Sequence, residues 1–128
     1  MYRNAANYGG RLEDMLKPLK ALGDESRLKM LWILEDRELC SCEIQEVIEL
    51  AQSTVSRHLQ ILEDAGFVVA EKVGLWKNYR LNPVPSPAVQ GLLGLVRLSA
   101  AAEPEAQAAR EKAAAVDREL LCAGRSAA

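Results

Sequence analysis

The spacing of apolar residues changes once along this chain, after Gly66, and this change limits the possible folds more than any other feature. Before Gly66, apolar residues recur every three or four positions, which is typical of amphipathic helices. After it, residues 67–70 and 78–81 have the pattern of two short strands joined by a turn around Gly74. The sequence therefore predicts a block of helices followed by a β-hairpin.

The helical block divides into four segments, expected over residues 12–22, 25–34, about 40–48 and 52–65. Pro18 lies inside the first segment and predicts a kink or a later start of that helix. Asp24 is an N-cap for the second helix, and Gly66 ends the fourth in a left-handed conformation. The N-cap of the fourth helix is ambiguous, because Ala51 is a poor cap and Ser53 a better one.

Residues 82–87 form a proline-rich linker after the hairpin, and an apolar helix follows over about 89–98. Pro104 interrupts that helix, and an alanine-rich helix is expected from about 105 to 122. The order α-α-α-α-β-β-α predicts a mainly α fold with a small β-hairpin, a winged helix-turn-helix.

Composition excludes several classes of protein. No apolar run approaches the ~18 residues of a membrane span, and residues 1–4 lack the apolar stretch of a secretion signal. The three cysteines are an odd number, and two of them are separated by a single residue. This spacing argues against a disulfide scaffold and for reduced thiols, so we expect a cytoplasmic protein.

The fourth helix has one apolar stripe and one polar face. Val55, Leu59 and Leu62 share the stripe, and the face opposite carries no carboxylate in its first two turns; it comprises Ser53, Ser56, Arg57 and Gln60. Arginine and glutamine side chains suit guanine and adenine edges in a major groove, and hydroxyls suit phosphates. The hairpin adds three basic residues for phosphate contacts, Lys72, Lys77 and Arg80.

An ordinary solvated helix face would have a similar composition, and the net charge of −2 does not by itself indicate nucleic-acid binding. The short helix before this face and the hairpin after it favour DNA binding, because a recognition helix needs a second helix to support it. We therefore expect a flexible arm over residues 1–10 and a DNA-binding domain over 11–82. A helical dimerisation segment and tail would occupy 83–128.

A homodimer is expected because the chain has more apolar helix surface than one small core requires. The first helix and the leucine-rich stretch from Leu92 to Leu98 would bury each other across a two-fold axis. This arrangement would set two recognition helices about one DNA turn apart.

Four stretches together resemble one known family, the ArsR/SmtB metalloregulatory repressors. They are residues 19–28 (LKALGDESRL), 38–44 (ELCSCEI), 52–59 (QSTVSRHL) and 74–81 (GLWKNYRL). The ELCSC element and the end of the hairpin look most like the arsenical-resistance branch. The resemblance implies a homodimeric repressor on an operator inverted repeat, released by As(III) or Sb(III), with no organic cofactor. It also implies DNA contacts from Gln52, Ser53, Thr54, Ser56, Arg57 and His58.

Cys40 and Cys42 are the expected metalloid ligands. Residues i and i+2 of a regular helix point in nearly opposite directions, so both thiols can reach one atom only if Cys40 is still extended. The chain departs from the arsenical branch at Gln45, where the best-known members have a third cysteine. Cys122 is the remaining candidate for a third thiol, whereas a mono-organic arsenical needs only two. The sequence supports an inorganic and an organic arsenical equally as the inducer.

Two other functions remain open at this point. The thiols could form a redox switch, or they could be small buried side chains in a regulator that binds DNA constitutively. An enzyme is not expected, because thiol oxidoreductases more often have Cys-x-x-Cys in an α/β fold. The single histidine, His58, argues against an imidazole-rich zinc or nickel site.

Overall fold

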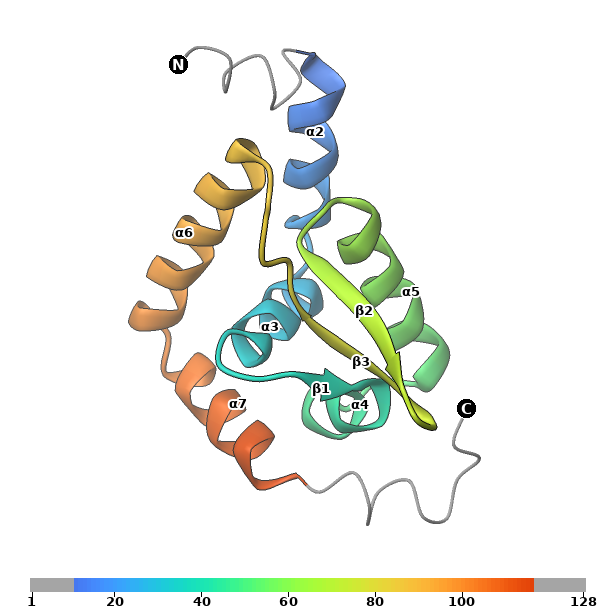
Figure 1. The fold of residues 1–128 in the computed structure, drawn as a ribbon. Coiled ribbons are helices and arrows are strands. Elements are labelled where there is room, and N and C mark those ends of the chain that lie inside the picture. Colours follow the sequence, from blue (N-terminus) through green and yellow to red (C-terminus); the bar gives the residue numbers. More distant parts are fainter. Residues whose placement is uncertain (1–10, 117–128) are drawn as a thin grey trace.

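The computed structural model describes residues 11–116 of the chain, and Figure 1 shows a mainly helical protein with one small sheet. The elements in chain order are α2 (Leu12–Ala21), α3 (Glu25–Leu34), β1 (Leu39–Cys40), α4 (Ser41–Ile48), α5 (Gln52–Asp64), β2 (Val68–Val73), β3 (Trp76–Leu81), α6 (Pro87–Ala102) and α7 (Pro104–Ala115). The predicted winged helix-turn-helix is confirmed. The expected arm, residues 1–10, lies outside the described residues.

Helix α3 and its cap are as predicted, since Asp24 Oδ1 accepts a hydrogen bond of 3.1 Å from the Arg27 N–H. Of the two alternatives expected at Pro18, the later start is wrong, because α2 begins at Leu12 and continues through Pro18, and the kink stays a prediction. The N–H that Pro18 lacks would have bonded to the carbonyl of Asp14, an exposed residue that water can solvate. Ala51, not Ser53, is the N-cap of α5.

The sheet has three antiparallel strands in the order β1-β3-β2, of which the sequence predicted only two. β2 and β3 form the wing, the hairpin that closes where Gly74 has a φ of +62°. The missed strand β1 has two residues, and Leu39 pairs with Tyr79 while Cys40 pairs with Asn78. So short a strand has no periodicity of its own and forms only because β3 offers it a partner.

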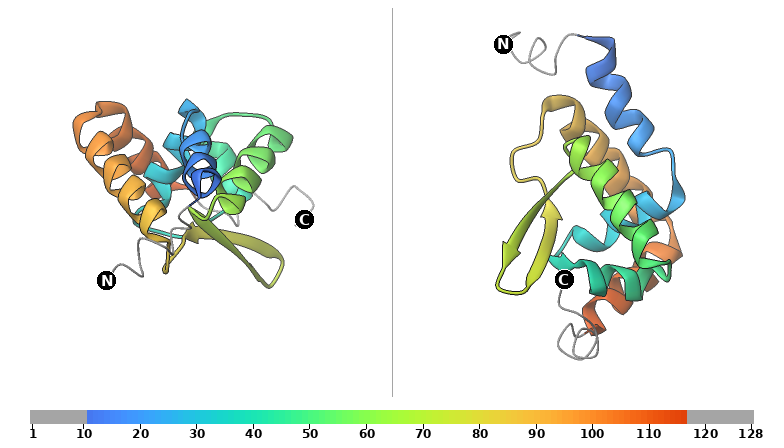
Figure 2. Two further views of the ribbon diagram at one scale, coloured as in Figure 1. Left: turned by 90° about the horizontal axis from the view of Figure 1, so that it is seen from above. Right: turned by 90° about the vertical axis from the view of Figure 1, so that its right-hand side faces the viewer.

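One hydrophobic core joins all the helices. Met30, Leu31 and Ile33 of α3 are at most 2 % exposed, and α4, α5, α6 and α7 pack against α3 (Figure 2). Leu93 of α6 and Ala113 of α7 belong to the same core as α3 and α5. Residues 83–116 therefore pack directly on the winged part of the chain. The role of this segment in dimerisation stays a prediction.

The last described helix is shorter than expected. Helix α7 ends at Ala115, and Val116 has an extended backbone with a ψ of 149°. The sequence predicted a helix continuing to Cys122, but alanine-rich periodicity marks the end of a helix poorly. Residues 117–122 lie outside the described residues.

Leu59→Ala tests the orientation of α5, because this side chain is 0 % exposed and faces the core. We expect the substitution to lower the free energy of unfolding by about 2–5 kcal/mol, through lost burial and the cavity left behind. The measurement is urea unfolding followed by circular dichroism. Val84→Ala is the matched control: Val84 is 83 % exposed, and the change should stay within about 0.5 kcal/mol. Equal effects of the two substitutions would contradict the packing described.

Candidate nucleic-acid interface and thiol pocket

Helix α5 presents the predicted polar face to solvent. Its apolar stripe is fully buried and Thr54 is half-buried. The exposed polar side chains of the predicted face are Gln52, Ser53, Ser56, Arg57 and Gln60. The Gln60 amide donates a hydrogen bond of 2.9 Å to Asp64 Oδ1, which aligns it along the helix. Because Ala51 provides no side-chain cap, the first backbone N–H groups of α5 are not capped by their own N-cap residue. Such a helix start suits a phosphate oxygen.

His58 differs from its neighbours because its ring is only 7 % exposed. Its Nδ1 lies 3.0 Å from Arg27 Nη1, and its Nε2 lies 3.9 Å from Asp24 Oδ1. A guanidinium has no acceptor, so Nδ1 accepts and the neutral ring carries its proton on Nε2. The ring therefore connects α5 to the start of α3. A direct DNA contact from His58 stays a prediction, and this burial does not favour it.

Arg27 is a residue that sequence reasoning missed. Its Nε donates a hydrogen bond of 2.6 Å to the Ala21 carbonyl at the end of α2, and its Nη1 faces His58 of α5. One guanidinium on α3 thus joins three helices. Local spacing indicates only the cap at Asp24, because the pairing with His58 spans 31 residues.

The wing carries the three predicted basic residues in two different settings. Lys72 and Lys77 are exposed cross-strand partners, so their like charges lie on one side of the hairpin. A phosphate beside them would relieve this repulsion. Arg80 is half-buried, and its Nε lies 3.8 Å from Glu38 Oε2. The structure therefore presents the two lysines more freely than the arginine.

Cys40 and Cys42 line one cavity of about 270 Å³ between the start of α4 and the wing. They are 1 % and 8 % exposed. Cys40 is the N-cap of α4 with an extended backbone (φ −86°, ψ 167°), and Cys42 lies in the first turn. The extended conformation removes the opposition that two such residues would have inside a regular helix. Cys40 therefore has the extended backbone that a shared thiol site requires, and the site itself stays a prediction.

Backbone and side-chain bonds tie this site to the wing and to α4. The Cys40 N–H donates a hydrogen bond of 2.8 Å to Glu43 Oε1 in the first turn of α4. On its other side, Cys40 pairs with Asn78 of β3, whose Nδ2 donates to Glu38 Oε1 at 3.4 Å. A change in the backbone at Cys40 therefore acts on both the wing and α4.

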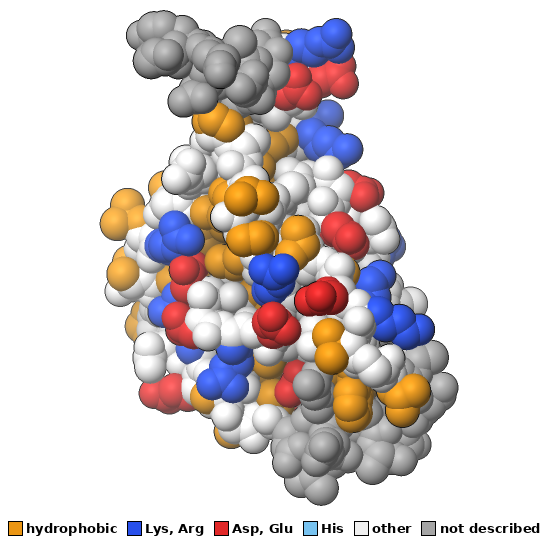
Figure 3. Space-filling model, viewed as in Figure 1, with side chains coloured by type: hydrophobic (Ala, Val, Ile, Leu, Met, Phe, Trp, Pro, Cys, Tyr) orange, Lys and Arg blue, Asp and Glu red, His pale blue; other side chains and the backbone are white. Residues whose placement is uncertain are grey.

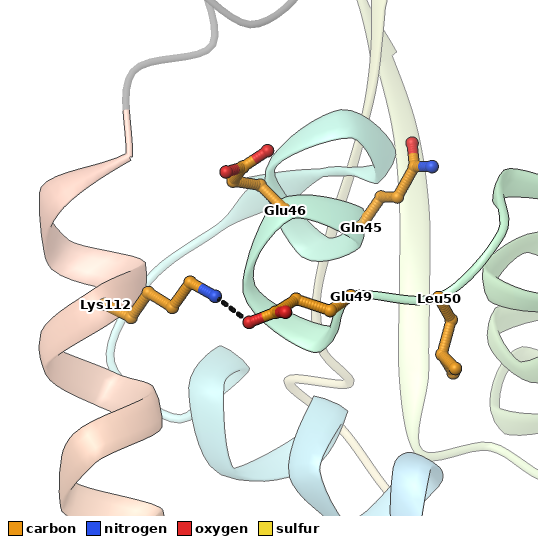
Figure 4. A pocket seen from close by; sticks show the side chains of 5 residues that line it. All are labelled: Gln45, Glu46, Glu49, Leu50 and Lys112. Atoms are coloured by element: carbon orange, nitrogen blue, oxygen red, sulfur yellow. Dashed lines mark hydrogen bonds and ion pairs between the residues drawn. The ribbon is translucent and has the colours of Figure 1, made fainter.

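Gln45 faces a different part of the surface. It lines a polar pocket of about 430 Å³ with Glu46, Glu49, Leu50 and Lys112, not the cavity that Cys40 and Cys42 share (Figure 4). There Lys112 of α7 pairs with Glu49, which has a left-handed backbone at the end of α4. The hydrogen bond from Lys112 lowers the pKa of Glu49.

Cys122, the third predicted ligand, lies outside the described residues. Within residues 11–116, no group of three or more His, Cys, Asp and Glu side chains is placed to hold a metal ion. This described part of the chain therefore contributes two thiols to the site. None of its helices has the length and apolar content needed to cross a bilayer.

Comparison with known proteins identifies the family. Residues 24–69 match the family described as bacterial regulatory protein, arsR family. The arsenic resistance transcriptional regulator ArsR1 of Pseudomonas putida is 38 % identical over 89 residues, covering 66 % of this chain and 70 % of that protein. The chain belongs to the arsR family of regulatory proteins. The resemblance noted in the sequence is thereby confirmed.

Two further arsR-family matches support this assignment. The arsenical resistance operon repressor of Bacillus subtilis is 41 % identical over 75 residues, covering 58 % of this chain and 69 % of that protein. A solved structure from Mycobacterium bovis is described as the homodimeric winged helix-turn-helix DNA-binding domain of a possible ArsR-family transcriptional regulator. It is 28 % identical with a TM-score of 0.60, and the match covers 74 % of this chain and 86 % of that one.

His58 makes stability depend on pH. Burial lowers its pKa below the ordinary value of 6.5, and the charges of Arg27 and Arg57 add to this against the attraction of Asp24. The unfolded state therefore binds a proton at a higher pH than the folded state. The free energy of unfolding should be highest above pH 6.5 and fall as the pH drops below it.

Urea unfolding between pH 7.5 and 5.5 measures this effect. The matched variant is His58→Gln, because the chain has one histidine. Its stability should change much less over the same interval. A fall in stability of equal size in both proteins would show that another group is responsible.

Proposed function

We propose that this chain is a metalloid-responsive transcriptional repressor that binds an operator inverted repeat as a homodimer in the cytoplasm. As(III), Sb(III) or a trivalent organoarsenical would bind the thiols of Cys40 and Cys42 and release the protein from DNA. The observation that carries the proposal is the shared cavity of these two thiols beneath the wing. The relatives from Pseudomonas putida and Bacillus subtilis, whose names refer to arsenic resistance, support the inducer class.

The DNA interface would consist of α5 in the major groove and the wing along the backbone. Arg57 and Gln60 would contact base edges, and the polar side chains of the first turn would contact bases or phosphates; these are Gln52, Ser53, Thr54 and Ser56. Lys72 and Lys77 would bind phosphates, with Arg80 adding charge at the base of the wing. We assign His58 a positioning role, because its ring is held between Arg27 and Asp24.

The dimer would form through α2 and α6. Both helices expose large hydrophobic side chains, namely Leu12, Met15, Leu16 and Leu19 on α2 and Leu95 and Leu98 on α6. Figure 3 shows hydrophobic side chains at the left edge of the molecule, where α6 lies. Exposed apolar surface of this extent suits a permanent contact with a second copy.

Release would follow from strain at the junction of β1 and α4. Each bond between arsenic and sulfur replaces a bond between arsenic and hydroxide and releases one water, without oxidation or reduction. Bringing both sulfurs onto one atom pulls Cys40 toward Cys42 and acts on the pairing of Cys40 with Asn78. It also acts on α4, which packs against α5. A coupling of ~1–3 kcal/mol would weaken DNA binding about 5- to 150-fold.

Arg57→Ala should weaken binding to the preferred DNA duplex by about 1–3 kcal/mol and relax the choice of base at one position. Lys72→Ala should weaken binding to all duplexes alike and reduce the slope of log affinity against log salt by about 1. The duplex is first selected from a random pool with the native protein, and affinities are measured by fluorescence anisotropy at several salt concentrations. Identical behaviour of the two variants would contradict the division between base and phosphate contacts.

Cys40→Ser and Cys42→Ser should keep DNA affinity within about twofold of the native protein and abolish release by arsenite, since serine cannot form the soft sulfur bond. Anisotropy of the same duplex, with and without arsenite, antimonite, Zn(II) and peroxide, gives the readout. Cys122→Ser, made in parallel, reports whether the third cysteine takes part. Release of both substituted proteins by arsenite would refute the site, and release by peroxide alone would identify a redox switch.

A further inference from the structure

The thiol cavity has an apolar wall, which an inorganic arsenic atom bound to two sulfurs would not contact with a carbon group. Cys40 and Cys42 form its inner side and pack with Trp76 as a small hydrophobic cluster separate from the main core. Leu75, at the tip of the wing, forms part of the outer wall and is 67 % exposed. Figure 3 shows hydrophobic side chains at the lower right, over this tip. The two thiols therefore lie beside an apolar wall that has room next to it.

The cavity is suited to a small occupant. Its volume of about 270 Å³ is just below the ~300 Å³ at which sites for small organic molecules begin. A single arsenic atom bound to two sulfurs would leave most of this space to water. Lys72 and Lys77 also line the cavity, and the carbon stem of a lysine adds to an apolar surface when it lies along one.

The number of thiols selects among trivalent arsenicals by the number of hydroxides that each can exchange for sulfur. Arsenite has three hydroxides to exchange for sulfur, whereas an arsenical with one carbon substituent has two. Within residues 11–116 the site offers two thiols, Cys40 and Cys42, which match the second kind. This pair of thiols would replace both hydroxides of such a ligand, and its carbon substituent would point away from the sulfurs.

We propose that this cavity binds mono-substituted trivalent arsenicals, R–As(OH)₂, with the substituent R packed against Leu75 and Trp76. This inference rests on the proposed function and specifies its ligand. Two thiols displace two hydroxides as water, the As–C bond stays intact, and arsenic remains trivalent. An aromatic R buries more apolar surface against the wing than a methyl group does, so phenylarsenite binds more tightly than methylarsenite.

The test compares phenylarsenite, methylarsenite and arsenite on the reduced full-length chain. Trp76 lies in the cluster with the thiols, so tryptophan fluorescence reports binding without any DNA. Affinities are obtained by competition with a small dithiol, and mass spectrometry counts the bound arsenic. We expect phenylarsenite to bind at least about tenfold more tightly than methylarsenite.

Two wing variants separate the role of the substituent from that of the thiols. Leu75→Ala should weaken phenylarsenite about three- to tenfold and change arsenite by less than about twofold. Val73→Ala is the matched control, because Val73 is also exposed on the wing at 46 % but does not line the cavity. It should change neither affinity. Cys122→Ser should leave phenylarsenite binding unchanged.

The outcomes distinguish this inference from the proposed function. If no arsenical binds a protein that contains Cys40 and Cys42, both the inference and the proposed function are wrong. Binding of arsenite with no preference for phenylarsenite, or equal weakening of both ligands by Leu75→Ala, would overturn the inference and leave the repressor intact. Loss of phenylarsenite binding in Cys122→Ser would also overturn it, because the two-thiol site would then be insufficient.

Discussion

The antiparallel pairing of Leu39 and Cys40 with β3 is the contact on which the rest of this site depends. It places the first thiol residue in extended backbone, at the point where the wing and α4 meet. Without this pairing, Cys40 would be free to enter α4, and the two thiols would point to different sides of the helix. The pairing of Leu39 and Cys40 with β3 also places the two thiols in one cavity with Leu75 and Trp76. A short strand thus positions both the ligands and the wall of their cavity.

The DNA-facing helix is supported from two directions. Helix α4 packs on α5 from the thiol side, and Arg27 and Asp24 hold His58 from the opposite end of the motif. Arg27 also donates a hydrogen bond to the Ala21 carbonyl at the end of α2, so the helix proposed to form the dimer contact is joined to α5. The helices that would bind DNA, a second copy of the chain and a thiol ligand therefore pack against one another. Such a shared set is the physical requirement for coupling between sites.

Much of the architecture was predictable because its signals are local. Asp24, Gly66 and Gly74 mark ends and turns by their own conformational preferences, and the structure has each of them in the expected role. The stripe of Val55, Leu59 and Leu62 predicted which face of α5 is buried. The end of α7 was not predicted correctly, because alanine-rich stretches set helix ends weakly.

The sequence by itself determined the order of the elements, the polar face that contains Arg57, and the presence of two thiols at the start of a helix. These features depend on residues within a few positions of one another. Only the tertiary structure decided that β1 forms, that Gln45 lines a different pocket from the two thiols, and that His58 is held by Arg27. Each of these depends on contacts between segments far apart in the chain. Burial and pairing energies, not local spacing, determine which such contacts form.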